Sequence, residues 1–271
     1  MKYFFDEWKK FEKELLNKQL FLFLDYDGTL APIAETPETA VMPQAVRKSL
    51  ITLSKSPGCH LTAVSGRMLA DLKQKIDIPG ITYVGTHGLE MDDPEMDTRQ
   101  LVSGDYMEDL SDIKALLTEQ LAALKGILVE DKKMVLTVHY RLSDYTEAVL
   151  AKKIFMDVCR SYLNSQRINV LEGKKVIEVR PPVQWNKGDA VLWLSAKWQK
   201  KVNKEKMLIM YAGDDVTDED AFRAIGNLGL TVKIGDPEGS AAQYYLKAQN
   251  EMGSFLKQIS ETLSKGKEKT A

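Results

Sequence analysis

The sequence has few cysteines, no long apolar run and almost no net charge. Its two cysteines, Cys59 and Cys159, are too few for a disulfide framework and favour a reducing compartment. The longest early apolar run, Leu20 to Leu24, is far shorter than a signal-peptide core or a membrane span. The 37 lysines and arginines against 39 aspartates and glutamates give a formal charge of −2, which excludes a globally basic nucleic-acid-binding protein. We therefore expect a cytoplasmic protein that binds neither nucleic acid nor membrane.

A repeated order of strand, polar loop and helix organises much of the chain. Hydrophobic residues make up 44% of the 271 residues and charged residues 28%, which is typical of a globular protein with a real core. Apolar runs without polar alternation, which are typical of strands buried on both faces of a parallel sheet, occupy residues 20–24 and 207–212, and further strand-like segments occupy residues 59–64 and 81–84. The pattern predicts an α/β fold with a doubly wound, Rossmann-like core around a parallel sheet.

The middle of the sequence follows a different pattern. A helix, two strands, a second helix and two more strands are predicted at residues 106–125, 127–130, 134–141, 145–163, 168–171 and 175–180. The strand pattern resumes near residue 207. We therefore expect a core α/β domain in two segments, 1–106 and 184–271, with a smaller αββαββ cap domain at 107–183 inserted between them.

Polar side chains follow the predicted strands, where a doubly wound sheet binds its ligand. Asp25 and Asp27 follow one strand, and because residues i and i+2 project to the same side, both can address one atom. The other candidates at strand ends or helix starts are Thr29, Ser65, Arg67, Lys187, Asp214, Asp215 and Asp218. Each residue taken alone is also compatible with an ordinary turn, a helix cap or a solvated surface position.

Two acidic clusters that face one site require a counter-charge. Their repulsion costs stability unless a cation or a lysine neutralises it. Carboxylate oxygens with few other ligands suit Mg²⁺, which keeps several waters and coordinates a substrate phosphate. A carboxylate such as Asp25 can act as a nucleophile, and Asp27 can serve as an acid and then as a base. The combination predicts phosphoryl chemistry, with Thr29 or Ser65 and Lys187 on the phosphate oxygens.

The order of these motifs resembles that of the haloacid-dehalogenase-like phosphohydrolases. The four matching motifs are Asp25 to Thr29, Ser65, Lys187 and Gly213 to Asp218. From about Gln19 to Leu256 the sequence is similar to the trehalose-6-phosphate phosphatase family. The strings that carry this similarity are SGR at 65–67, GTHGLE at 85–90, VHYR at 138–141, GKKVIEVRP at 173–181, NKG at 186–188 and GDDVTDEDAF at 213–222. The family commonly has asparagine where Thr86 stands, a difference expected to affect only a peripheral contact.

The resemblance implies a role for each matched residue. Asp25 would take the phosphoryl group, and Asp27 would protonate the leaving sugar oxygen and then activate water. Mg²⁺ would be held by the Asp25 side chain, the Asp27 backbone carbonyl and Asp214, with support from Asp218. The implied phosphate-binding residues are Thr29, Ser65, Gly66, Arg67 and Lys187. The implied sugar-binding residues are His87, Glu90, Arg141, Lys174 and Glu178.

The resemblance also implies a reaction, the release of trehalose and phosphate from trehalose 6-phosphate, and a functional link to a trehalose-6-phosphate synthase. Sucrose-phosphate and mannosyl-3-phosphoglycerate phosphatases are alternatives that keep the core and change the cap. A phosphoacceptor signalling domain also combines Asp, Mg²⁺, a hydroxyl and Lys, but it needs neither Asp27 nor a cap. A catalytically silent domain is disfavoured because no motif residue is missing.

Overall fold

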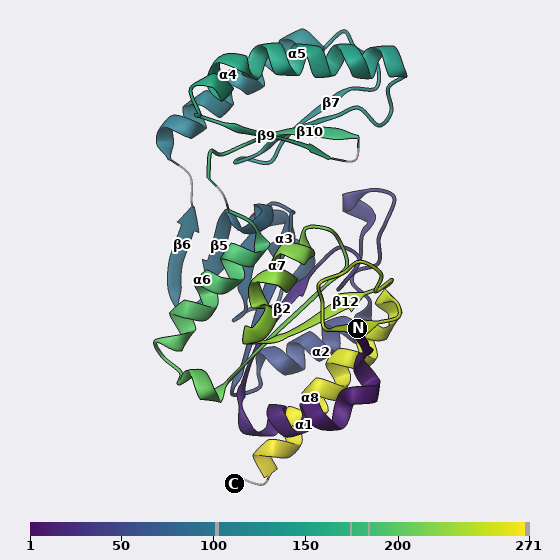
Figure 1. Cartoon of the computed structure of the whole chain (residues 1–271), viewed down its shortest axis with the longest axis vertical. Helices are drawn as coiled ribbons and strands as arrows, with labels where there is room; N and C mark the ends of the chain where they lie inside the picture. The colour runs from purple at the N-terminus through teal and green to yellow at the C-terminus, as the bar shows by residue number, and fades with distance from the viewer. Residues whose placement is uncertain (101–102, 174, 184, 269–271) are drawn as a thin grey trace. The chain divides into compact units, whose positions relative to one another are not determined.

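The chain folds into two compact units. The computed structural model describes residues 1–100, 103–173, 175–183 and 185–268 (Figure 1). One unit comprises Met1–Arg99 and Trp185–Ala271, and the other comprises Gln100–Gln184. The sequence-based limits of the insert, 107 and 183, lie just inside those of the second unit. Among the described helices, none combines the length and the apolar character that crossing a membrane would require.

A nine-stranded sheet, counted over the described residues, forms the centre of the first unit. Its strands lie in the order β1 (Lys2–Tyr3), β13 (Tyr244–Leu246), β12 (Leu230–Ile234), β11 (Met207–Gly213), β2 (Gln19–Asp25), β3 (Cys59–Val64), β4 (Thr82–Gly85), β5 (Glu90–Asp93) and β6 (Met96–Gln100). Neighbours from β1 to β4 are parallel, and β5 is antiparallel to β4. The predicted α/β fold with a parallel sheet is confirmed.

Strand β2 supplies side chains to two separate hydrophobic clusters. Leu20, Leu22 and Leu24 belong to one cluster, and Phe21 and Phe23 belong to the other. Successive side chains of a strand point to opposite faces of the sheet, so both faces must be covered by helices. This double burial explains the uninterrupted apolar run in the sequence.

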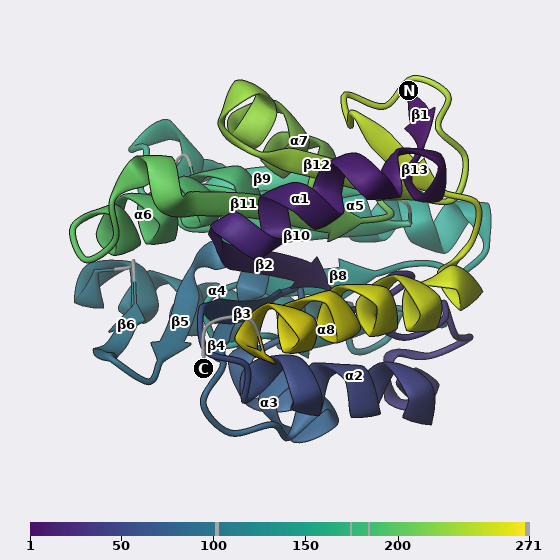
Figure 2. The same cartoon turned by 90° about the horizontal axis from the view of Figure 1, so that it is seen from below.

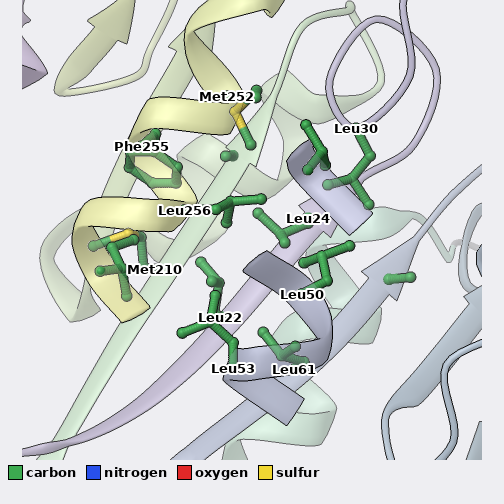
Figure 3. Close-up of a cluster of buried hydrophobic side chains, with 14 of the residues drawn as sticks. Leu22, Leu24, Leu30, Leu50, Leu53, Leu61, Met210, Met252, Phe255 and Leu256 are labelled. Atoms are coloured by element: carbon green, nitrogen blue, oxygen red, sulfur yellow. The ribbon is translucent and has the colours of Figure 1, made fainter. Parts of the chain in front are cut away.

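Helices cover both faces of this sheet. The cluster that contains Leu22 receives side chains from α1 (Trp8–Asn17), α2 (Gln44–Ser54), α3 (Leu69–Ile76) and α8 (Met252–Glu268). The other cluster receives side chains from α6 (Lys187–Gln199) and α7 (Asp218–Ile225). Figure 2 shows α8 running alongside α2, and Figure 3 shows Phe255 and Leu256 of α8 above Leu22 and Leu24 of β2. The covered faces leave the strand ends as the place where polar loops gather.

The second unit has the αββαββ order of elements. Its sheet has the order β7 (Leu128–Asp131), β8 (Leu136–His139), β10 (Val176–Arg180) and β9 (Asn169–Gly173), and all described neighbours are antiparallel. The helices α4 (Gly104–Leu121) and α5 (Tyr145–Asn164) share one hydrophobic cluster with this sheet. Strand β8 ends at His139, not at residue 141 as predicted. The chain turns there, and Ser143 donates a hydrogen bond to the Tyr140 carbonyl just before α5 begins.

We expect Leu22→Ala to lower the free energy of unfolding by about 2–5 kcal/mol, because it leaves a cavity in a core that cannot fully close. Leu22 is 0% exposed, whereas Ile33 is 79% exposed, so Ile33→Ala is the matched control with an effect within about 0.5 kcal/mol. All four tryptophans, Trp8, Trp185, Trp193 and Trp198, lie in the first unit, so urea unfolding followed by tryptophan fluorescence reports on that unit. Equal losses in the two variants would contradict the assignment of this core.

Candidate active site

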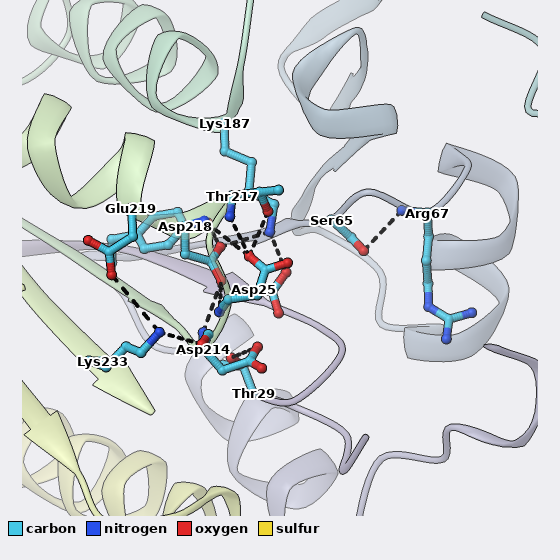
Figure 4. Close-up of polar contacts among 12 residues, drawn as sticks. Asp25, Thr29, Ser65, Arg67, Lys187, Asp214, Thr217, Asp218, Glu219 and Lys233 are labelled. Carbon is cyan, nitrogen blue, oxygen red and sulfur yellow. Dashed lines mark hydrogen bonds and ion pairs between the residues drawn. The ribbon is translucent and has the colours of Figure 1, made fainter. Parts of the chain in front are cut away.

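The site forms where two neighbouring parallel strands end. Asp25 is the last residue of β2, and Asp214 directly follows β11. The register pairs Leu24 with Ala212, so both strands deliver their carboxylates to the same edge of the sheet (Figure 4). Asp25 and Asp214 are separated by most of the chain in the sequence, and the parallel pairing of β2 with β11 brings them together.

Lys187 joins two buried carboxylates. Its Nζ donates to Asp25 Oδ1 at 2.8 Å and to Asp218 Oδ1 at 2.7 Å. Lys187 is 2%, Asp25 4% and Asp218 0% exposed. The lysine is the first residue of α6, where a capping box between Asn186 and Asp189 fixes the first turn. The start of this helix therefore sets the position of the ammonium group.

Asp218 also organises the loop between β11 and α7. Its Oδ1 accepts a hydrogen bond from the Tyr211 hydroxyl at 2.6 Å. Its Oδ2 accepts from the backbone N–H groups of Asp214 at 2.9 Å and Asp215 at 3.0 Å. The Asp215 carboxylate in turn accepts from the N–H of Asp218 at 3.1 Å. These reciprocal bonds hold the loop in one conformation and fix the position of the Asp214 backbone.

The carboxylates outnumber the cations at this site. Burial raises the pKa of Asp25 well above its ordinary value; Lys187 opposes the shift, and Asp218 and Asp214 add to it. Burial, followed by the charges of Asp218 and Asp215, raises the pKa of Asp214 to about 7. Burial disfavours the charged form of Lys187, but the carboxylates of Asp25 and Asp218 outweigh it and raise its pKa. One ammonium therefore does not neutralise the cluster.

The residues present fit a divalent cation. Asp25, Asp214 and Asp218 each place a carboxylate oxygen within 4.8 Å of the others. The Thr29 hydroxyl donates to Asp214 Oδ1 at 3.3 Å. Gly28 has φ +81°, and a Cβ there would lie 2.1 Å from Asp214 Oδ2, so only glycine permits this close approach. A set of hard oxygen donors with excess negative charge is suited to Mg²⁺.

Asp27 is held by a different cation. Arg67 Nε donates to Asp27 Oδ2 and Arg67 Nη2 donates to Asp27 Oδ1, both at 2.6 Å. The backbone N–H of Arg67 donates to Ser65 Oγ at 3.2 Å (Figure 4). The sequence grouped Arg67 with the phosphate-binding residues, whereas the structure directs its guanidinium group to the carboxylate of Asp27.

A strained turn after β4 supports the loop that carries Ser65 and Gly66. Thr86 and His87 have φ values of 48° and 55°, in the left-handed region. The N–H of His87 donates to the Ser65 carbonyl at 3.0 Å, and a Cβ on Gly66 would lie 2.5 Å from His87 Cε1. Gly66 therefore permits the His87 ring to pack against this loop.

Glu90 lies inside the first unit. Its Oε2 accepts hydrogen bonds from the Thr86 hydroxyl at 2.8 Å and from the N–H of Leu69 at 3.3 Å. The buried carboxylate thus joins the turn at Thr86 to the first residue of α3. In this geometry Glu90 supports the Ser65 loop from within.

The predicted sugar-binding residues of the second unit have different surroundings. Glu178 is buried on the face of the sheet opposite the hydrophobic cluster and accepts hydrogen bonds from Thr137 at 3.0 Å and from Arg180 at 2.6 and 2.9 Å. Burial alone would raise the pKa of Glu178, but the charges of Arg180 and Lys132 outweigh it and lower the pKa. Arg141 is exposed in the turn after β8. Lys174 lies outside the described residues.

Three supporting residues went unrecognised in the sequence. Tyr211 holds Asp218, Lys233 of β12 donates to the Asp214 carbonyl, and Asp71 binds Arg67 Nη1 at 2.7 Å. Lys233 lies between two apolar residues within β12. The sequence could have indicated its role, because a lysine in an otherwise apolar strand requires a partner. Asp71 stands four residues after Arg67, at the spacing of a helical ion pair.

Solved structures define the class of the protein. Aspergillus fumigatus trehalose-6-phosphate phosphatase matches with a TM-score of 0.67 and 25% identity, over 94% of this chain and 97% of that chain. The C-terminal domain of Candida albicans trehalose-6-phosphate phosphatase matches with a TM-score of 0.71 and 25% identity, over 93% and 96%. The shared fold is that of the haloacid-dehalogenase-like hydrolases. In this chain, the central strand β2 ends in an aspartate that is bound by a buried lysine.

Sequence comparison narrows the class to one family. The trehalose-phosphatase family profile matches residues 23–250. Probable trehalose-phosphate phosphatase D of Arabidopsis thaliana is 30% identical over 258 residues, covering 90% of this chain and 68% of that protein. The trehalose-phosphate phosphatase of Mycobacterium bovis is 32% identical over 257 residues, covering 92% of this chain and 63% of that protein. The chain belongs to the trehalose-phosphatase family of phosphoric monoester hydrolases.

We expect Lys187→Met to lower the free energy of unfolding by about 3–5 kcal/mol, because it leaves Asp25 and Asp218 buried side by side without their cation. The matched control is Lys201→Met, which removes the exposed ion pair with Glu95 and should change stability by about 0–1 kcal/mol. Urea unfolding followed by tryptophan fluorescence measures both. A loss in Lys187→Met no larger than that in the control would show that the buried pair is dispensable.

Proposed function

We propose that this enzyme hydrolyses trehalose 6-phosphate to trehalose and phosphate, with Mg²⁺ as cofactor and with a phosphoryl group carried transiently on Asp25. The observation that carries the proposal is the buried Asp25, which ends a central strand between Lys187 and the Asp214–Asp218 loop, with Asp27 two residues further on. Family membership supports the substrate, and the geometry supports the chemistry.

Asp25 and Asp27 have different roles in the two steps of the proposed reaction. In the first step an Asp25 oxygen forms a bond to phosphorus while the bond from phosphorus to the sugar oxygen breaks, and Asp27 gives its proton to that oxygen. In the second step Asp27 takes a proton from water, the water oxygen attacks phosphorus, and the bond to Asp25 breaks. Asp27 is then protonated again, so each cycle consumes one water and releases one alcohol and one phosphate.

The remaining residues of the proposed site bind charge. Lys187 offsets the negative charge beside Asp25, and it can donate to a phosphate oxygen together with the hydroxyls of Thr29 and Ser65 and the backbone of Gly66. The Asp25 side chain, the Asp27 backbone carbonyl, Asp214 and Asp218 would hold Mg²⁺. The ion would supply electrostatic stabilisation of the phosphoryl oxygens.

We assign the sugar specificity to side chains of the second unit, with Arg141 and Glu178 as the contacts and Lys174 as a further candidate. Guanidinium and carboxylate groups match the donors and acceptors of sugar hydroxyls. His87 and Glu90 contribute from the first unit, Glu90 by supporting the turn at Thr86. The substrate must come from a reaction that makes a phosphorylated disaccharide, which links the enzyme functionally to a trehalose-6-phosphate synthase.

Asp25→Asn should abolish phosphate release from trehalose 6-phosphate, because the amide is a poor nucleophile, while the folded structure is retained. The assay measures inorganic phosphate with Mg²⁺ and with EDTA, and circular dichroism checks the fold. The wild-type enzyme should lose its activity in EDTA and regain it when Mg²⁺ is added back. Full activity of Asp25→Asn, or of the wild type in EDTA, would overturn the corresponding assignment.

Arg141→Ala and Glu178→Gln should raise KM for trehalose 6-phosphate about 10-fold or more and change KM for p-nitrophenyl phosphate little, because the aryl ester has no sugar to recognise. Trehalose 6-phosphate, sucrose 6-phosphate and mannosyl-3-phosphoglycerate are compared on the wild type. Leu142→Ala, which removes an 87% exposed side chain next to Arg141, is the control. Equal KM changes for both ester types would remove these residues from specificity, and a preference for another sugar phosphate would change the assigned substrate.

A further inference from the structure

Arg67 forms a bidentate ion pair with Asp27, and the chemistry proposed above gives Arg67 no role. Two parallel hydrogen bonds of 2.6 Å join the guanidinium group to both carboxylate oxygens. Bidentate pairing fixes the plane as well as the position of the carboxylate. Asp27 is therefore held in one orientation.

The other donors of Arg67 are also engaged. Nη1 donates to Asp71 Oδ2 at 2.7 Å, and Nη2 donates to the Pro37 carbonyl at 2.7 Å. Together with the two bonds to Asp27, these contacts use four of the five N–H groups that an arginine has. A guanidinium group bonded in this way has little capacity left for a phosphate.

Arg67 is the fixed partner of the pair and Asp27 is the accessible one. The Arg67 side chain is 7% exposed and that of Asp27 is 42% exposed. The guanidinium carbon lies 5.2 Å from the centre of the Tyr26 ring, and the Tyr26 hydroxyl donates to the Ala40 carbonyl at 3.2 Å. Because Tyr26, Asp71 and Pro37 hold the arginine from different directions, it can serve as a rigid support for Asp27.

We propose that Arg67 is a positioning residue for Asp27, which fixes the carboxylate that exchanges a proton with the leaving sugar oxygen and then with water. This inference rests on the acid and base role proposed above for Asp27, and it replaces the phosphate-binding role that the sequence implied for Arg67. Both oxygens of Asp27 accept from Arg67 when the residue acts as base. When one oxygen carries the proton, the other keeps its hydrogen bond, so the orientation is preserved in both steps.

Leaving groups of different acidity separate a positioning role from a binding role. The sugar alkoxide of trehalose 6-phosphate is a poor leaving group that needs a proton from Asp27, whereas p-nitrophenolate departs without one. The second step, in which Asp27 activates water, is common to both esters, so the first step is followed in single turnover as release of trehalose or of p-nitrophenolate. Arg67→Met should slow this release about 10- to 100-fold for trehalose 6-phosphate and much less for p-nitrophenyl phosphate, with small changes in KM. Arg67→Lys, which keeps the charge but loses the fork, should lie between the wild type and Arg67→Met.

A milder variant tests the same role in case Arg67→Met does not fold. Asp71→Asn removes one anchor of Arg67 and leaves Asp27 intact, so it should show the same preference for the aryl ester with a smaller loss. Thermal unfolding of every variant checks the fold. If Arg67 binds phosphate, KM rises for both esters in Arg67→Met; if its role is only structural, the release of trehalose and of p-nitrophenolate in single turnover slows equally. Either result overturns the inference.

Asp27→Asn distinguishes failure of this inference from failure of the proposed function. In single turnover, this variant should slow the release of trehalose from trehalose 6-phosphate far more than the release of p-nitrophenolate from the aryl ester. Without that difference, the acid role of Asp27 is wrong and the role of Arg67 is overturned with it. If Asp27→Asn shows the difference and the Arg67 and Asp71 variants do not, only the positioning role is overturned.

Discussion

The contact of Lys187 with Asp25 and Asp218 is the interaction on which the rest of the site depends. Two carboxylates at 4% and 0% exposure cannot stay charged side by side without a cation, and the ammonium group is 2.7–2.8 Å from both. The cation is delivered by the start of α6, and Asp218 ties the Asp214 loop to the same cluster. The end of one strand, one helix start and one loop are therefore fixed together.

The two aspartates of the first motif are paired with different cations. Asp25 faces a fully buried lysine, and Asp27, only two residues away, faces an arginine on the more open side. The proposed nucleophile and the proposed proton carrier need different surroundings, because the first would attack phosphorus and the second would exchange protons with solvent and the leaving group. The structure provides this difference through the partners of the two residues, with identical side chains at both positions.

The sequence was sufficient to predict the α/β fold and the clustering of Asp25, Lys187, Asp214 and Asp218, but not the residues that hold this cluster in place. The apolar run at Leu20–Leu24 requires a strand covered on both faces, and the polar residues after it mark the site edge. Strand β5, with the sequence EMDD, has no such pattern, because Glu90 and Asp93 are buried by specific hydrogen bonds and not by apolar packing. The pairing of Arg67 with Asp27 depends on how two loops meet, which no local pattern encodes.

The central strand β2 lies between β3, from the first segment of the chain, and β11, from the second. Asp27 finds its partner Arg67 within the first segment, whereas the partner of Asp25, Lys187, comes only after the insert. During synthesis from the N-terminus, the Asp27–Arg67 pair can therefore form well before Asp25 is neutralised. One edge of β2 and one buried aspartate must remain unsatisfied while the whole second unit emerges from the ribosome. Assembly of the proposed catalytic site thus requires the segment that follows the insert.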